Sequence, residues 1–189
     1  MSEVSTMAQV ASHLRRALAE GKYRPGQKLP EANLCHDLGV SRNTLREAFR
    51  LLESEALLLH QPNRGVFVRR PDLASILDIY AVRRLLEPHI LRQSTPLHAG
   101  ADRLFETADA LQNAAVAEDW SRVGRLNIAF HMAVIALADS PRLDSMFERI
   151  FAEMQLCFLD LPEGTDLHKP YVPMKAEIIE YFRRFCCNG

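Results

Sequence analysis

The chain has 189 residues, of which 48% are hydrophobic and 25% charged, an ordinary balance for a globular protein with one large or two small domains. No apolar run reaches the roughly 18 residues of a membrane-spanning helix, and the first residues lack the basic region and apolar core of a secretory signal. The net charge of −1 divides into +3 over residues 1–72 and −4 over the remainder, which suggests one domain that faces nucleic acid and one that does not.

The first elements predicted are three helices. Apolar residues recur at helical spacing over residues 6–20, and Gly21 ends this helix. A short second helix follows, and Gly39 provides the turn after it. Ser41 can cap the third helix, which is expected to run to about Glu55.

The third helix carries Arg42, Arg46 and Arg50, four residues apart and therefore along one side of its surface. A capped, cationic helix that follows a tight turn has the build of a DNA recognition helix. Arg50 is expected to face solvent or phosphate rather than a base, and Glu47 to pair with an arginine of the same domain. This helix therefore predicts sequence-specific DNA binding.

Two β-prone runs, residues 57–60 and 66–69, follow the third helix and flank a segment rich in turn residues. They predict a hairpin, so residues 1–70 form a winged helix-turn-helix. The tip of the wing, Asn63-Arg64-Gly65, can enter a DNA groove because glycine lets the backbone approach closely.

Several separated strings resemble the DNA-binding domain of GntR-family transcriptional regulators over residues 6–70: Pro25-Gly26-x-x-Leu29-Pro30, Leu38-Gly39-Val40-Ser41-Arg42, Leu45-Arg46-Glu47-Ala48 and Gly65-Val66-x-Val68. The resemblance implies DNA contacts from the start of the third helix and from the wing, at Ser41, Arg42, Asn43, Thr44, Arg46, Arg64 and Gly65. Ala56 stands where the family usually has glycine, and this alanine is expected to strain the exit of the helix slightly.

After a polar hinge, residues 73–189 read as helix throughout, and no convincing strand is found. The pattern predicts an antiparallel helical bundle. Its helices are expected at residues 73–94, 99–118, 119–138, 141–159 and 173–185. The fold class expected for the whole chain is therefore mainly α.

The strings Arg83-x-x-Leu86-Glu87 and Phe130-His131 resemble the ligand-binding FCD domain of the FadR-like GntR subgroup. The resemblance implies that residues 73–189 form an effector-binding and dimerisation domain with a small-molecule pocket inside the bundle. In many members a divalent metal in that pocket helps to hold a carboxylate effector. Its ligands include an aspartate, a histidine four residues later, and two further histidines on the last helices.

Residues 126–138 are apolar except for Asn127 and His131, which share one face of the helix. Buried polar groups need partners. The two side chains either satisfy each other and nearby backbone, or face a polar group, a water, a metal or a ligand. Together with Arg83, which can bind a carboxylate directly, they are the candidate effector-binding residues.

A metal site and a cofactor are not expected. Asn127 replaces the family's aspartate, no histidine stands near Met174-Lys175, and His131 alone remains of the four ligands. A lone imidazole does not hold a transition metal tightly. Residues 181–189 also depart from the family pattern, which suggests a bundle that lacks its last helix.

The four cysteines show no paired metal-ligand spacing, so a cytoplasmic chain with reduced thiols is expected. The leading hypothesis is a repressor that binds palindromic double-stranded DNA as a homodimer and responds to a small carboxylate effector. The alternative is a degenerate GntR-type DNA-binding protein with no working effector site. A metal-dependent enzyme built on the bundle is disfavoured, because the sequence has no nucleophile–base pair and no complete ligand set.

Overall fold

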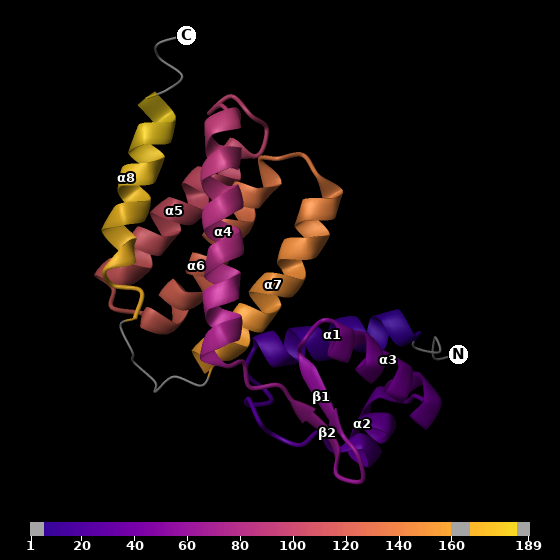
Figure 1. Cartoon of the computed structure of the whole chain (residues 1–189). Coiled ribbons are helices and arrows are strands. Elements are labelled where there is room, and N and C mark those ends of the chain that lie inside the picture. The colour runs from indigo at the N-terminus through magenta and orange to yellow at the C-terminus, as the bar shows by residue number, and fades with distance from the viewer. Residues whose placement is uncertain (1–5, 160–166, 185–189) are drawn as a thin grey trace. The chain divides into compact units, whose positions relative to one another are not determined.

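The computed structural model describes residues 6–159 and 167–184, which contain eight helices and one two-stranded antiparallel hairpin (Figure 1). The predicted mainly α class, with a winged helix-turn-helix followed by a helical bundle, is confirmed. Contacts divide the chain into two compact units, Met1–Ile76 with Arg149–Asp160 and Leu77–Glu148 with Leu161–Gly189. Within the described ranges, every helix is too short or too polar to cross a bilayer.

The first unit begins with α1 (Met7–Ala19), α2 (Glu31–Leu38) and α3 (Arg42–Ser54). Thr6 caps α1, since its hydroxyl accepts from the Gln9 N–H while the Gln9 side chain accepts from the Thr6 N–H. Gly39 ends α2 in the left-handed conformation that the tight turn requires. One apolar core joins these helices to the hairpin and includes Leu14, Leu45 and Leu52.

The hairpin consists of β1 (Leu58–Gln61) and β2 (Gly65–Val68), in a register that pairs Leu58 with Val68. Val66 and Val68 are buried in the core, as the alternation of strand side chains requires. The backbone of residues 27–29 also bonds to β2, through hydrogen bonds between Leu29 and Val66 and between Val68 and Gln27. These bonds fix the wing to the segment that precedes α2.

Ala56 follows α3 with a φ of 59°, in the left-handed region that favours glycine. The Leu57 N–H donates to the Leu52 carbonyl across this turn, so the chain leaves the helix and enters β1 directly. For an L-residue with a Cβ this conformation costs roughly 1–2 kcal/mol. The expected strain at the helix exit is therefore confirmed.

The second unit contains α4 (Leu73–Gln93) from Leu77 onward, α5 (Ala101–Val116), α6 (Trp120–Ala136), the first part of α7 (Pro141–Leu159), and α8 (Tyr171–Arg184). The helix α5 packs against both α6 and α8 (Figure 1). The five predicted helices are confirmed, and α8 begins two residues before its predicted start. Phe185, the predicted end of that helix, and the divergent tail to Gly189 lie outside the described residues.

Two details differ from the predicted pattern. Leu85, an apolar residue of the helix predicted over residues 73–94, is 75% exposed, because its neighbour Leu86 occupies the more buried side of the helix. The second part of α7 belongs to the first unit, where Leu156 enters the core and the Gln155 amide donates to the Ala19 carbonyl at 2.9 Å. The helical spacing of apolar residues predicts which side of a helix is buried, but not which domain that side packs against.

Candidate functional site

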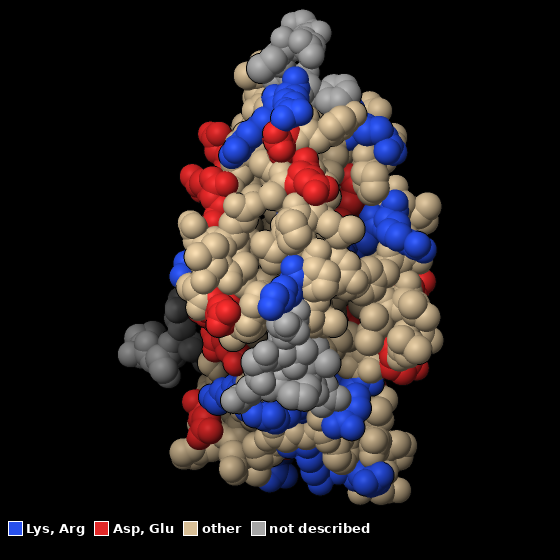
Figure 2. All heavy atoms as spheres, turned by 90° about the vertical axis from the view of Figure 1, so that its left-hand side faces the viewer, with Lys and Arg blue, Asp and Glu red and all other residues tan. Residues whose placement is uncertain are grey.

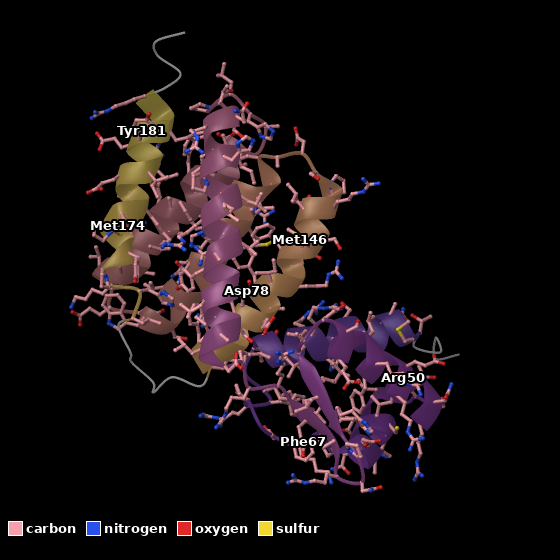
Figure 3. The ribbon with its side chains drawn as sticks, viewed as in Figure 1. Arg50, Phe67, Asp78, Met146, Met174 and Tyr181 are labelled. Carbon is pink, nitrogen blue, oxygen red and sulfur yellow. The ribbon has the colours of Figure 1, made fainter. Side chains whose placement is uncertain are left out.

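The start of α3 presents a cationic, solvent-facing surface. Ser41 caps the helix, with its Oγ accepting from the Thr44 N–H at 3.1 Å. Arg42, Arg46 and Arg50 are exposed, whereas the opposite side of the helix is buried in the core (Figure 3). Among the described residues no carboxylate forms an ion pair with these three arginines. Free cations beside the positive end of a helix dipole favour contact with phosphate.

The expectation that Glu47 pairs with an arginine is wrong. Glu47 Oε1 accepts a hydrogen bond of 3.1 Å from the Asn43 amide, its neighbour one helical turn earlier. The acidic side chain therefore orients Asn43 at the start of α3 and leaves Arg42 and Arg46 unneutralised.

The wing adds further positive charge. Its tip turns through Asn63 and Gly65, whose φ angles are 62° and 104°. Arg64 is exposed and its guanidinium lies 5.7 Å from the centroid of the Phe67 ring. A Cβ on Gly65 would lie 2.9 Å from Lys28 Cε, so this position has room only for glycine unless the lysine moves. Figure 2 shows Lys and Arg side chains gathered over the first unit, in the lower part of the picture.

Lys28 was not predicted as part of this surface. It is exposed and pairs by a backbone bridge with Phe67 of β2. A single lysine between a turn and a helix has no sequence pattern that indicates proximity to the wing. Gly65 lies about 120 Å of extended chain away, at roughly 3.3 Å per residue. The fold alone brings Lys28 to Gly65.

The second unit contains a buried polar network between α4 and α6. Arg83 Nε donates to Glu87 Oε1 at 2.9 Å, and His131 Nδ1 lies 3.0 Å from Glu87 Oε2. Arg83 Nη2 lies 2.6 Å from His131 Nε2. We assign the Nδ1–H tautomer, in which Nδ1 donates to Glu87 and Nε2 accepts from Arg83. The network thus consists of one cation, one anion and a neutral imidazole.

Burial sets the charges of this network. Desolvation lowers the pKa of His131 to about 4, against the opposing effect of Glu87, so the ring is neutral near pH 7. Burial alone would raise the pKa of Glu87, but hydrogen bonds from His131 and the charge of Arg83 outweigh it and lower that pKa. Glu87 is therefore ionised and balances Arg83.

The network lines a cavity of about 180 Å³ within the second unit, between α4, α6 and the segment that includes α8. The predicted residues Arg83, Asn127 and His131 all line it. Two further polar residues that sequence reasoning missed, His168 and Lys175, line it as well and are buried. The rest of the wall is mainly apolar or aromatic, with Tyr80, Leu91, Phe130, Val134, Met174 and Ile178.

Lys175 lies on the inner side of α8 with only 7% of its surface exposed. Burial, reinforced by the charge of Arg83, lowers the pKa of Lys175 to about 8. Its Nζ lies 5.7 Å from the Phe130 ring centroid and 6.0 Å from that of Tyr171. Burial, with Lys175 and Arg83 nearby, also lowers the pKa of His168 to about 4.

Asn127 is 5% exposed, and its side-chain amide has no hydrogen-bond partner among the described residues. The alternative in which Asn127 and His131 satisfy each other is therefore wrong, because His131 bonds to Glu87 and Arg83 instead. An unpaired amide at the wall of a cavity can form hydrogen bonds with a molecule bound inside that cavity.

These residues do not fit a divalent metal. Both ring nitrogens of His131 have partners in the network, Asn127 supplies only a neutral amide, and the Lys175 ammonium would repel a cation. Within residues 6–159 and 167–184, no group of three or more His, Cys, Asp or Glu side chains lies close enough together to hold a metal ion.

Two family models match this chain. The model "Bacterial regulatory proteins, gntR family" matches residues 6–68, and the model "FCD domain" matches residues 78–180. The chain belongs to the GntR family. The GntR match contains α1 to β2 with every predicted DNA-contacting residue, and the FCD match contains every residue that lines the cavity. Both resemblances predicted from the sequence are confirmed.

Relatives over most of the chain are transcriptional regulators. The galactonate operon transcriptional repressor of Escherichia coli K12 is 30% identical over 83% of this chain and 77% of its own length. The regulator McbR of the same organism is 27% identical over 98% of this chain and 81% of its own. The crystal structure of a GntR regulator from Rhodococcus sp. RHA1 has 35% identity and a TM-score of 0.85, covering 94% of this chain and 86% of that one.

This GntR-family chain is a transcriptional regulator with an FCD domain. Members of the family bind DNA, and FCD domains bind small-molecule effectors. Among the charged residues and histidines that line the pocket, the sequence did not point to Glu87, His168 or Lys175. A signal was present for Lys175, because it is the single charged residue of the stripe Val172, Lys175, Ile179 and Phe182 on the inner side of α8.

Proposed function

We propose that this regulator is a repressor that binds a palindromic operator as a homodimer and is released by a small carboxylate effector. The observation that carries the effector part is the cavity of the FCD domain, where buried cationic and unpaired polar groups face an otherwise apolar space. The names of two relatives agree with it, since one is a galactonate operon repressor and another is named for an L-lactate dehydrogenase operon.

On the DNA side, Arg42 and Arg46 contact base edges or flanking phosphates in the major groove. Ser41, Asn43 and Thr44 lie beside them at the start of α3, and Arg64 and Gly65 contact the backbone or the minor groove through the wing. The support is that Ser41, Asn43 and the arginines are exposed. No carboxylate among the described residues forms an ion pair with Arg42, Arg46 or Arg64. A dimer would present two copies of α3 to half-sites about one helical turn apart.

On the effector side, Arg83, Asn127 and His131 contact the ligand from α4 and α6. Binding there changes operator affinity when the ligand favours one arrangement of the dimer over another. A degenerate pocket would be expected to collapse onto apolar side chains. The unpaired amide of Asn127 and the buried ammonium of Lys175 support a working site instead.

The test is fluorescence-anisotropy binding to DNA from upstream of the protein's own gene, with unlabelled random DNA as competitor. We expect tight binding that resists the competitor, and Arg46→Ala should weaken it by about 1–3 kcal/mol and relax specificity. Arg103→Ala removes an exposed arginine of α5 and serves as the matched control. Binding that random DNA competes away fully, or equal effects of the two variants, would contradict the assignment of α3.

A further inference from the structure

The cavity of the FCD domain contains one buried charge that nothing in the described residues balances. Lys175 is 7% exposed and forms no ion pair or hydrogen bond with the described part of the chain. Its ammonium group lies over the faces of the Phe130 and Tyr171 rings. A buried ammonium without an acceptor is costly, so its position indicates a missing anionic partner.

The other charges of the cavity do not supply that partner. Glu87, the carboxylate of the cavity wall, bonds to Arg83 and His131, and it acts on Lys175 only at longer range. His131 and His168 are both neutral near pH 7. With Arg83 and Glu87 compensating each other, the described residues of the wall carry one excess positive charge, which a single negative charge on a ligand would neutralise.

The remaining features describe the rest of the ligand. The Asn127 amide is a second unpaired group, able to donate to a carboxylate oxygen. Leu91, Val134 and Ile178 give the wall its apolar character, as does Met174 on α8 (Figure 3). An apolar cavity of roughly 150 Å³ accepts benzene, so about 180 Å³ suits a body of roughly that size.

We propose that Lys175, assisted by Asn127, anchors the carboxylate of a small monocarboxylate with an apolar or aromatic body, and that it does so without a metal. The inference rests on the proposed function, because it names the charge, the size and the anchoring residue of the effector. A dicarboxylate would bring a second charge into a cavity that has no second free cation among its described residues. A neutral molecule of the same shape would leave the ammonium unpaired.

The experiment is thermal unfolding of the full chain in buffer with EDTA, with benzoate as the probe. Benzamide serves as the neutral analogue and terephthalate as the dianion. Three proteins are compared: the wild type, Lys175→Met, and Lys169→Met, which removes an exposed lysine beside Trp120 that does not line the cavity. Isothermal titration of benzoate gives the affinity.

We expect benzoate to raise the Tm of the wild type and of Lys169→Met, while benzamide and terephthalate do not. Lys175→Met should lose at least tenfold in benzoate affinity. Without ligand, Lys175→Met should melt roughly 4 °C higher than the wild type, because the uncompensated charge is gone. This rise also shows that the variant folds.

Other outcomes distinguish a wrong anchoring residue or ligand class from the absence of an effector site. Equal benzoate affinity in Lys175→Met and the wild type would overturn the anchoring role and leave the effector site in place. Stabilisation by terephthalate or benzamide in place of benzoate would overturn the monocarboxylate class. No stabilisation of the wild type by any of the three probes would count against both this inference and the proposed effector site.

Discussion

His131 shows how one residue's environment decides its role. From its position on a nearly apolar helix, the partner of its imidazole could be a metal, a ligand or another side chain. The structure adds Arg83 and Glu87, which bond to the two ring nitrogens, while burial keeps the imidazole neutral. The network thereby stabilises the wall of the cavity, and Lys175 remains a buried charge of that wall with no ion-pair partner among the described residues.

Because His131 and His168 are buried and neutral, we expect the folded chain to lose stability in acid. The pKa of His131 and of His168 is about 4 in the folded chain and 6.5 in the reference state, so the unfolded chain binds more protons between these values. Stability is therefore lost as the pH falls from 6.5. For His131 alone the loss is about 2 kcal/mol by pH 5, above the range in which most carboxylates titrate.

The measurement is urea unfolding at pH values from 7 to 5. His131→Gln should be less stable than the wild type at pH 7 but show a shallower loss toward pH 5. His36→Gln replaces a histidine whose side chain is 90% exposed and should leave the slope unchanged. The same slope in His131→Gln as in the wild type would contradict a buried neutral His131.

At the scale of the element, most of the fold could be predicted because periodicity and turn residues act locally. The apolar spacing of α1, the Gly39 turn, the Ser41 cap and the Asn63–Gly65 tip all specify structure within a few residues. Contacts between helices could not be predicted in the same way. His168 precedes α8 in a turn without periodicity, and Lys28 reaches the wing only through the backbone bridge to Phe67.

The exit of α3 yields a prediction at this scale. Because Ala56 has a φ of 59°, Ala56→Gly should stabilise the chain by roughly 1 kcal/mol in urea unfolding. Ala74→Gly, at an exposed position within α4, should destabilise it by up to about 1 kcal/mol. Destabilisation by Ala56→Gly would mean that the residue does not adopt the left-handed conformation in solution.

At the scale of the whole molecule, the two units differ in where they place their positive charges. The winged helix-turn-helix exposes unpaired arginines on α3, and the FCD domain buries cations around an apolar cavity. Family membership explains why both occur in one chain, but the chemistry of the pocket belongs to this sequence. Lys175 and Asn127 distinguish it from the metal-holding pattern that the family resemblance implied.

The most direct test of this account measures the coupling between the pocket and the operator. Operator affinity is determined by fluorescence anisotropy with and without saturating benzoate, for the wild type and for Lys175→Met. We predict that benzoate weakens operator binding of the wild type by roughly 5- to 150-fold and leaves Lys175→Met unaffected. Unchanged affinity in the wild type, or an equal change in both proteins, would contradict the account.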